Sequence, residues 1–241
     1  MWGVSLFSCF FIASYIFKKL KKDEEKITLI IQYVFIFGLI GSRLAHVFFY
    51  NFDYYMSAPW QILAVWNGGL ASHGGVIGGL IGLYIFCKRN KDYGFFWTLD
   101  HGIITVMLMA SLIRFGNLMN SELYGKPTDM PWGFIFVQVD NVARHPVVLY
   151  ESIAYLFIQF LMIYLFNKYQ ESKPGIYIVV FLFLVFSVRF FLEFFKEPDG
   201  QMIGGIISKT QALDLPFVIA GMVLFYFVAQ GKLHYKQAVN G

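Results

Sequence analysis

Long apolar runs, separated by short polar connections, constrain this chain more than any other feature of its sequence. Clear examples extend from Ile27 to about Tyr50, from Val147 to Phe166 and from Gly175 to Phe195. A helix needs about 20 apolar residues to cross a hydrocarbon core of about 30 Å. Only 14% of the 241 residues are charged, against roughly 25% in soluble domains. The sequence therefore predicts an integral membrane protein.

Seven runs in all have the composition of transmembrane helices. They cover approximately Trp2–Phe17, Ile27–Tyr50, Gly74–Cys87, Phe95–Ile113, Val147–Phe166, Gly175–Phe195 and Leu213–Val228. The first run lacks a basic leading region and a small-residue cleavage pattern, so we expect a retained span and not a cleaved signal peptide. We expect an all-α fold of seven transmembrane helices in a single polytopic domain, residues 1–241.

The longest polar stretch lies between the fourth and fifth runs, at residues 114–146. It contains Pro127, Pro131 and Gly133, which favour turns, and the alternating segment Phe134–Val139, which favours a strand. The stretch is too short for a separate domain. We expect it to form a small cap outside the membrane.

Lysine and arginine are distributed unevenly among the connections. Successive connections fall alternately on the two sides of the membrane. The connections on one side together carry only Lys126, Arg144, Lys196 and Lys209. The others carry Lys18, Lys19, Lys21, Lys22, Lys26, Lys88, Arg89, Lys91, Lys168, Lys173, Lys232 and Lys236. By the positive-inside rule the more basic side is cytoplasmic. We therefore expect the amino terminus and the cap outside, and the carboxyl terminus in the cytoplasm.

Polar residues interrupt the apolar pattern most abruptly at the end of the fourth run. They are Arg114, Asn117, Asn120 and Glu122. Such groups are costly at a membrane surface unless they have partners, whereas a guanidinium and amides together suit a phosphate or carboxylate. The segment indicates an anion-binding site. The structural alternative is a helix end that caps its own carbonyls and pairs Arg114 with Glu122, and the pattern alone leaves both open.

Further ionisable residues fall at the same expected depth, near the outer ends of other runs. They are Arg43, His46, His73, Tyr150, Glu151, Arg189 and Glu193. Each has a simple structural explanation, such as a local Arg189–Glu193 ion pair or a core position for His73. The neighbouring glycines, from Gly74 to Gly79, have one in close helix packing. Their common depth favours one shared site, because each would otherwise carry its own burial cost.

A phospholipid is the expected ligand of such a site. Guanidinium groups can hold a phosphate and stabilise the charge of a leaving phosphate, while an imidazole or carboxylate can accept a proton. Physical reasoning alone leaves hydrolysis, group transfer, flipping and transport open. Against a flippase or transporter, the charges share one depth and no inverted repeat is visible. A different headgroup enzyme, such as a phospholipid hydrolase, also remains open.

The same residues resemble the bacterial prolipoprotein diacylglyceryl transferases. The family signature of an Arg, a Gly-Asn pair, an Asn, a Glu and a Gly is similar in spacing to Arg114, Gly116-Asn117, Asn120, Glu122 and Gly125. The resemblance covers the chain from about Trp2 to Gly221. Further similar blocks, in family order, are Gly41-Ser42-Arg43, Phe49-Tyr50-Asn51, Trp66–Gly69, Ser72–Gly75, His145-Pro146, Leu149-Tyr150-Glu151, Arg189-Phe190, Glu193-Phe194 and Pro198-Asp199.

This resemblance implies an enzyme of the bacterial inner membrane. It would move the diacylglyceryl group of phosphatidylglycerol onto the thiol of a preprolipoprotein lipobox cysteine, releasing glycerol phosphate. The resemblance implies His73 as base or proton relay, and Arg114 and Arg189 as the catalytic groups that hold the phosphate. It implies a substrate-binding shell of Arg43, Asn117, Asn120, Glu122, Gly125, Tyr150, Glu151 and Glu193.

The expected site opens toward the outer leaflet of the membrane. We expect a monomer without cofactor or nucleic-acid partner, and no metal, because the histidines lack Cys or carboxylate partners at ligand spacing. The chain departs from the family at Val147-Val148, where Ser-Gln is common, and at Val185, where Tyr is often found. The short amino terminus is a third departure. None of these positions is His73, Arg114 or Arg189.

Overall fold

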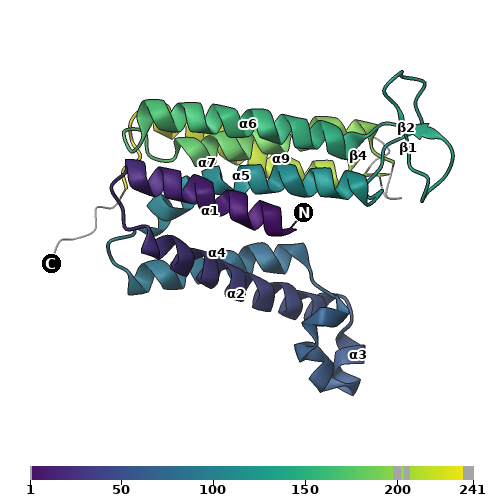
Figure 1. The fold of residues 1–241 in the computed structure, drawn as a ribbon, viewed down its shortest axis with the longest axis horizontal. Coiled ribbons are helices and arrows are strands. Elements are labelled where there is room, and N and C mark those ends of the chain that lie inside the picture. The colour runs from purple at the N-terminus through teal and green to yellow at the C-terminus, as the bar shows by residue number, and fades with distance from the viewer. Residues whose placement is uncertain (1, 198–201, 204–206, 236–241) are drawn as a thin grey trace. The chain divides into compact units, whose positions relative to one another are not determined.

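Helices dominate the computed structural model, which describes residues 2–197, 202–203 and 207–235 (Figure 1). Helical segments follow the seven predicted runs, with short strands and turns between them. The elements in chain order are α1 (Trp2–Lys19), α2 (Glu25–Phe49), α3 (Phe52–Ser57), η1 (Pro59–Leu63), η2 (Val65–Asn67), α4 (Ser72–Arg89), α5 (Phe95–Met119), β1 (Phe134–Ile135), β2 (Ala143–Arg144), α6 (Val147–Tyr169), α7 (Ile176–Val180), η3 (Phe181–Val185), α8 (Phe186–Leu192), η4 (Glu193–Phe195), β3 (Met202–Ile203), β4 (Ile207–Ser208) and α9 (Lys209–Ala229).

Among the described residues, five helical segments are long and apolar enough to cross a membrane. They are Glu25–Phe49, Phe95–Met119, Val147–Tyr169, Ile176–Phe195 and Thr210–Ala229. The first and third predicted runs also form helices, α1 and α4, of 18 residues each. At about 1.5 Å per residue such a helix is about 27 Å long, a little short of the hydrocarbon thickness. The protein is thus a helical, multi-pass membrane protein.

The chain divides into two compact units. Unit 1 takes the described residues of 1–16 and 100–235, and unit 2 takes residues 17–99. In unit 1, the segment from α7 to α8 packs against both α6 and α9 (Figure 1). Ser111 on α5 and Ser152 on α6 each donate a hydroxyl hydrogen bond to the other's carbonyl oxygen, at 2.8 and 2.9 Å. Small, mutually satisfied residues of this kind allow two apolar helices to approach closely.

The first helix of the chain packs within unit 1. The thiol of Cys9 donates to the carbonyl oxygen of Thr105 on α5 at 3.2 Å. The hydroxyl of Tyr15 donates to the side-chain oxygen of Asn167 on α6, and its ring lies 6.0 Å from that of Phe166. Contacts with α5 and α6 therefore hold both halves of α1.

A buried carboxylate organises one end of unit 1. Asp100 is fully buried and accepts hydrogen bonds from the backbone N–H groups of Gly175 at 2.8 Å and Ile178 at 2.7 Å. An anion at a helix N-terminus satisfies N–H groups that have no partner within the helix. The hydroxyl of Tyr235 donates to the same carboxylate. Asp100 thus fixes the start of α7 and the end of the described chain together.

The π-helical segment η3 packs directly on α9. A Cβ atom at Gly221 would lie 2.8 Å from the backbone nitrogen of Phe183, so only glycine fits this approach. At its start α9 has a capping box, in which Ser208 and Gln211 satisfy each other's backbone N–H groups. The last predicted run is therefore a helix fixed at its start and along its length.

Unit 2 is built on the antiparallel pair of α2 and α4, whose backbones touch at glycines. A Cβ atom at Gly78 would lie 2.1 Å from the carbonyl oxygen of Phe37, and one at Gly74 would lie 2.2 Å from that of Gly41. The expectation that these glycines serve close helix packing is confirmed. Between α2 and α4, the segments α3, η1 and η2 form a compact loop.

The predicted strand at Phe134–Val139 is shorter than expected. Only Phe134 and Ile135 are extended, and they pair antiparallel with Arg144 and Ala143. Phe136 then begins a turn, in which its carbonyl oxygen accepts from the backbone N–H of Val139 at 2.7 Å. The turn forms because the Phe136 side chain is buried in an apolar cluster. That cluster contains Phe136, Leu118, Val148, Phe115, Tyr124 and Leu149.

The same cluster explains one departure from the family pattern. Val147 and Val148 are both completely buried at the start of α6. Valine at these positions fills the core under the connection between α5 and α6. Apolar burial of this kind takes the place of whatever hydrogen bonds Ser-Gln would supply.

Candidate active site

Arg114 pairs with a buried carboxylate on another helix. Its Nε lies 2.8 Å from Glu151 Oε2, and the Glu151 side chain is 0% exposed whereas the Arg114 side chain is 22% exposed. The alternative in which Arg114 pairs with Glu122 is wrong, since the guanidinium turns toward α6. Opposite charges offset each other's burial cost, and the exposed part of Arg114 can face a ligand.

A lysine completes the surroundings of Glu151. Lys196 Nζ lies 3.0 Å from Glu151 Oε1 and 3.3 Å from Glu193 Oε2. Glu193 also accepts from the hydroxyl of Ser208 at 3.0 Å. Two cations thus share one buried carboxylate at the ends of α5, α6 and η4. Sequence reasoning assigned Lys196 only to an outer connection, although its position three residues after Glu193 was an available signal.

Arg189 pairs with Asp214 of α9 and not with Glu193. Its Nε lies 3.2 Å from Asp214 Oδ1, and the carboxylate is almost fully buried while the Arg189 side chain is 32% exposed. The local Arg189–Glu193 pair is therefore wrong. Sequence reasoning did not single out Asp214, although a lone acid in an apolar run was an available signal. Both arginines share one design, in which Nε is held by a buried acid and the remaining side chain is partly exposed.

Both asparagines of the signature hold Glu122. The side-chain amide of Asn117 donates to one carboxylate oxygen, and that of Asn120 donates to the other at 3.2 Å. Ser121 and Leu123, on either side of Glu122, have positive φ angles of 56° and 54°. Non-glycine residues adopt this region at some cost, which a functional constraint can maintain. The segment after α5 therefore fixes one exposed carboxylate in a strained turn.

Gly125 lies where three chain segments meet. A Cβ atom there would lie 2.5 Å from the carbonyl oxygen of His145 and 2.7 Å from that of Phe195. Gly125 also donates its N–H to His145 at 3.0 Å. Its role in the structure is close backbone approach. Nearby, the hydroxyl of Tyr150 accepts from the indole N–H of Trp132 at 2.9 Å.

Arg144 fixes the connection between α5 and α6. It lies 2.7 Å from Asp140 and 2.7 Å from Glu197, donates to the carbonyl of Gly125 at 3.1 Å, and stacks 5.1 Å from the ring centre of Tyr124. The hydrogen bond from Arg144 holds the pKa of Asp140 below its ordinary value of 3.8, and the same bond raises the pKa of Arg144. Sequence reasoning did not single out this cluster. Through Arg144, this cluster links the β1–β2 hairpin to Glu197, in the segment that follows η4.

Arg43 and His73 belong to unit 2. Arg43 is 5% exposed and stacks over the ring of Tyr55. All five of its N–H groups donate to backbone carbonyls in the loop between α2 and α4. The acceptors are Gln61, Ile62, Ala64, Gly68 and Gly69, at 2.5–3.1 Å. Arg43 therefore holds this loop in shape.

His73 is the second residue of α4 and is exposed. The alternative of a core histidine is wrong. Within the described residues no hydrogen bond holds its ring. His46, by contrast, stacks on Tyr50 at 5.5 Å and contacts the amide of Asn51 at 3.1 Å. The motif residues Pro198-Asp199 lie outside the described residues. Among the described residues, no three His, Cys, Asp or Glu side chains are placed to hold a metal ion.

Comparison with known proteins decides the family. The family model described as prolipoprotein diacylglyceryl transferase matches residues 1–227. The chain belongs to the prolipoprotein diacylglyceryl transferase family. The resemblance read from the sequence is thereby confirmed.

Curated members of the prolipoprotein diacylglyceryl transferase family align with nearly the whole chain. A phosphatidylglycerol–prolipoprotein diacylglyceryl transferase of Tolumonas auensis is 39% identical over 237 residues, 96% of this chain and 92% of the relative. One of Chloroherpeton thalassium is 42% identical over 226 residues, 92% and 84%. One of Bacteroides fragilis is 35% identical over 246 residues, 96% and 88%. Residues of both units of this transferase family member lie within the range 1–227 that the family model matches.

Proposed function

We propose that this chain transfers the diacylglyceryl group of phosphatidylglycerol to the lipobox cysteine of a preprolipoprotein. The sulfur attacks the glycerol carbon bonded to the phosphate oxygen, a thioether forms, and the carbon–oxygen bond breaks with its electron pair on glycerol phosphate. The thiol proton passes to a base. Family membership supports this function, and the observation that carries it is the pair of partly exposed arginines anchored on buried acids.

Arg114 and Arg189 hold the phosphate in this proposal. Each guanidinium is oriented through Nε by a carboxylate, Glu151 or Asp214, so the fork needs little reorganisation when the ligand arrives. As the carbon–oxygen bond breaks, negative charge grows on the leaving phosphate. Fixed donors next to that charge stabilise the transition state more than the ground state.

His73 accepts the thiol proton. Its ring is exposed on the first turn of α4. A free thiol has a pKa near 8.5, so a base raises the fraction of reactive thiolate at neutral pH. Arg43 acts through the loop that precedes His73. Its five carbonyl contacts, together with the hydrogen bond from Ala71 N to Ser42 O at 3.0 Å, set where α4 begins.

The remaining predicted residues form the support of the site. Glu151 and Glu193 place Lys196 beside Arg114. Glu122, held by Asn117 and Asn120, is exposed and available to the substrate. Gly125 and Tyr150 complete the predicted shell. Gly125 allows the close backbone approach to His145 and Phe195, and the hydroxyl of Tyr150 accepts a hydrogen bond from Trp132.

The topology proposed for this reaction has seven spans, with α1 and α4 added to the five long apolar segments. The amino terminus, the 114–146 cap and the active site face the outer side of the bacterial inner membrane, and the carboxyl terminus is cytoplasmic. The basic connections support this orientation. We propose that the chain acts as a monomer.

Mass spectrometry of a lipobox peptide tests the function. The purified chain is incubated with phosphatidylglycerol in detergent and either a Cys peptide or its Cys→Ser counterpart. We expect a thioether-linked diacylglyceryl adduct on the Cys peptide alone, and none with Arg114→Ala. Absence of the adduct from wild-type chain, with lipid moving between leaflets of vesicles, would indicate a flippase.

A further inference from the structure

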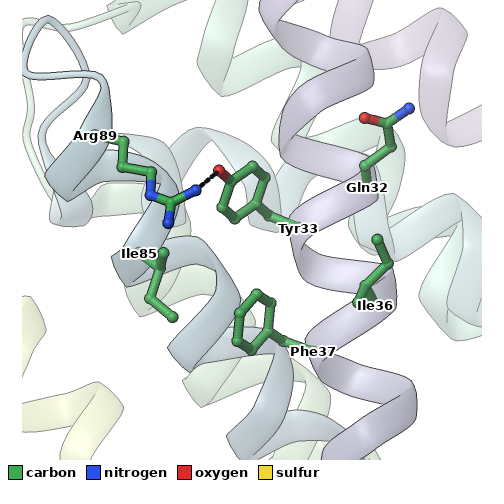
Figure 2. Close-up of a pocket in the computed structure, with 6 residues that line it drawn as sticks. All are labelled: Gln32, Tyr33, Ile36, Phe37, Ile85 and Arg89. Carbon is green, nitrogen blue, oxygen red and sulfur yellow. Dashed lines mark hydrogen bonds between the residues drawn. The ribbon is translucent and has the colours of Figure 1, made fainter.

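Unit 2 contains a hollow of about 200 Å³ between α2 and α4. Figure 2 shows Tyr33 and Phe37 of α2 facing Ile85 and Arg89 of α4, with Gln32 and Ile36 further round α2. Neither His73 nor Arg43 lines it. The hollow has polar groups at one end and apolar side chains at the other, which suits an amphipathic ligand.

Arg89 is positioned at the polar end of the hollow by an aromatic residue. One of its terminal nitrogens donates to the hydroxyl of Tyr33 at 2.8 Å, and the guanidinium lies 5.9 Å from the centre of that ring. Tyr33 is itself held by stacking on Phe37 and an edge contact with Phe86. Within the described residues Arg89 forms no ion pair. Its charge is therefore oriented but not neutralised.

The charges at this end of the helix pair favour an anionic ligand. Arg89 is the last residue of α4, and Tyr33 lies in the first half of α2. No carboxylate lines the hollow. The adjoining connections, residues 18–26 and 88–92, contain twice as many basic as acidic residues. Basic clusters next to a span attract anionic lipid headgroups.

The apolar end of the hollow continues along both helices. One helical turn beyond Ile36 lies Ile40, and one turn before Ile85 lies Ile81, on the same faces of α2 and α4. Ile36, Ile40 and Ile81 are all exposed. The helix pair thus offers an apolar track that starts beside the guanidinium, as an acyl chain attached to a phosphate requires.

We propose that this hollow binds an anionic phospholipid of the leaflet that adjoins the basic connections. The phosphate lies against Arg89 and Gln32, and an acyl chain follows the isoleucines. The site is separate from the proposed transferase site and does not depend on its reaction. A lipid bound here would hold the basic end of the α2–α4 pair at the membrane surface.

Lipid retention by the detergent-solubilised full chain, measured by native mass spectrometry, tests the proposal. The probes are dioleoyl phosphatidic acid and dioleoyl phosphatidylcholine, which differ in net charge. Phosphatidylglycerol is avoided because it is the proposed transferase substrate. We expect preferential retention of phosphatidic acid, and about fivefold weaker binding in Arg89→Gln, the effect of removing one interfacial charge.

Lys91→Gln is the matched control. It also removes one positive charge, two residues from Arg89, but the Lys91 side chain does not line the hollow. It should bind phosphatidic acid as the wild type does. Tyr33→Phe keeps the ring but frees Arg89, and should weaken binding by a smaller factor. Equal binding by Arg89→Gln and Lys91→Gln would overturn the proposal. So would equal retention of the two lipids, or displacement of phosphatidic acid by inorganic phosphate.

Discussion

Glu151 is the residue on which the charge network of unit 1 depends. It is completely buried and serves both Arg114 and Lys196. In Glu151→Gln the two cations keep their positions but lose their shared carboxylate. Removing one partner of a buried pair costs about 3–5 kcal/mol. We expect a loss of free energy of unfolding of this order, measured by thermal or denaturant unfolding in detergent, together with loss of transfer.

Glu122→Gln is the control for that substitution. The Glu122 carboxylate is exposed and is held only by amides, so its loss should change stability by about 1 kcal/mol or less. Equal destabilisation by the two variants would mean that burial of Glu151 is not what stabilises the network.

The sequence identified the charged positions of the site but not their partners. Arg114, Glu151, Arg189 and Glu193 could be selected because charge is rare in apolar runs. Helical spacing, however, relates only residues three or four apart on one helix. The observed acids lie on other helices, so pairing depends on how each helix is rotated in the bundle. Asp214 in particular is a lone acid whose partner only the fold defines.

At the scale of elements, glycine contacts determine how closely α2 and α4 approach. A Cβ at Gly78 would lie 2.1 Å from a carbonyl oxygen of Phe37, which is far inside contact distance. Gly78→Ala should force the helices apart and destabilise unit 2 by about 1–3 kcal/mol. Thermal unfolding in detergent measures this effect.

Gly102→Ala supplies the comparison for Gly78→Ala. It is also a helical glycine, but a Cβ there would have nothing within 4 Å. Alanine has the higher helix propensity by about 1 kcal/mol, so this variant should be as stable as the wild type or slightly more stable. Matching losses at the two positions would contradict a packing role for Gly78.

The hairpin connection, residues 133–145 with strands β1 and β2, should become less stable in acid. Arg144 holds the pKa of Asp140 below 3.8, so the folded state binds this proton less readily than the unfolded chain. The stabilisation is therefore present above the ordinary pKa and is lost as pH falls through the lowered one. Hydrogen exchange of residues 133–145 should show this opening below about pH 4. Asp140→Asn should show faster exchange already at neutral pH and little further change.

The positions of the helices followed from sequence but their ends did not, since α5 runs to Met119 and the predicted run ends at Ile113. The apolar runs and the helices agree because backbone groups in a hydrocarbon core must bond within their own segment. The alternating apolar pattern from Phe134 to Val139 predicted too long a strand. Burial of the Phe136 side chain against Leu118 competes with an extended backbone there. The π-helical turn η3, which packs closely against Gly221, was also not predicted from the sequence.

For the whole molecule, the proposed orientation can be tested by thiol labelling. Val137 in the hairpin connection is 79% exposed, and Lys91 follows α4. In a chain whose Cys9 and Cys87 are replaced by Ser, we expect Val137→Cys to react with an impermeant reagent on intact cells. Lys91→Cys should react only after permeabilisation. The reverse pattern would invert the topology, and the cysteine-free chain measures background.

Family and function were predictable for the whole chain because polar residues at a specific spacing stand out within apolar runs. The division into two units was not. Nothing in the sequence near residue 16 or residue 100 marks a boundary. Both positions fall within helices, α1 and α5, so the usual signs of a linker are absent.

The discontinuity of unit 1 imposes an order on biosynthesis. Helix α1 is made before α5 and α6, and Thr105 and Asn167, which receive its hydrogen bonds, are made only after residues 17–99 of unit 2. Residues 17–99 of unit 2 form one continuous stretch and can assemble while the nascent chain is still growing. Helix α1 must therefore wait in the membrane until α5 and α6 are made, and Asp100 gains the hydrogen bond from Tyr235 later still.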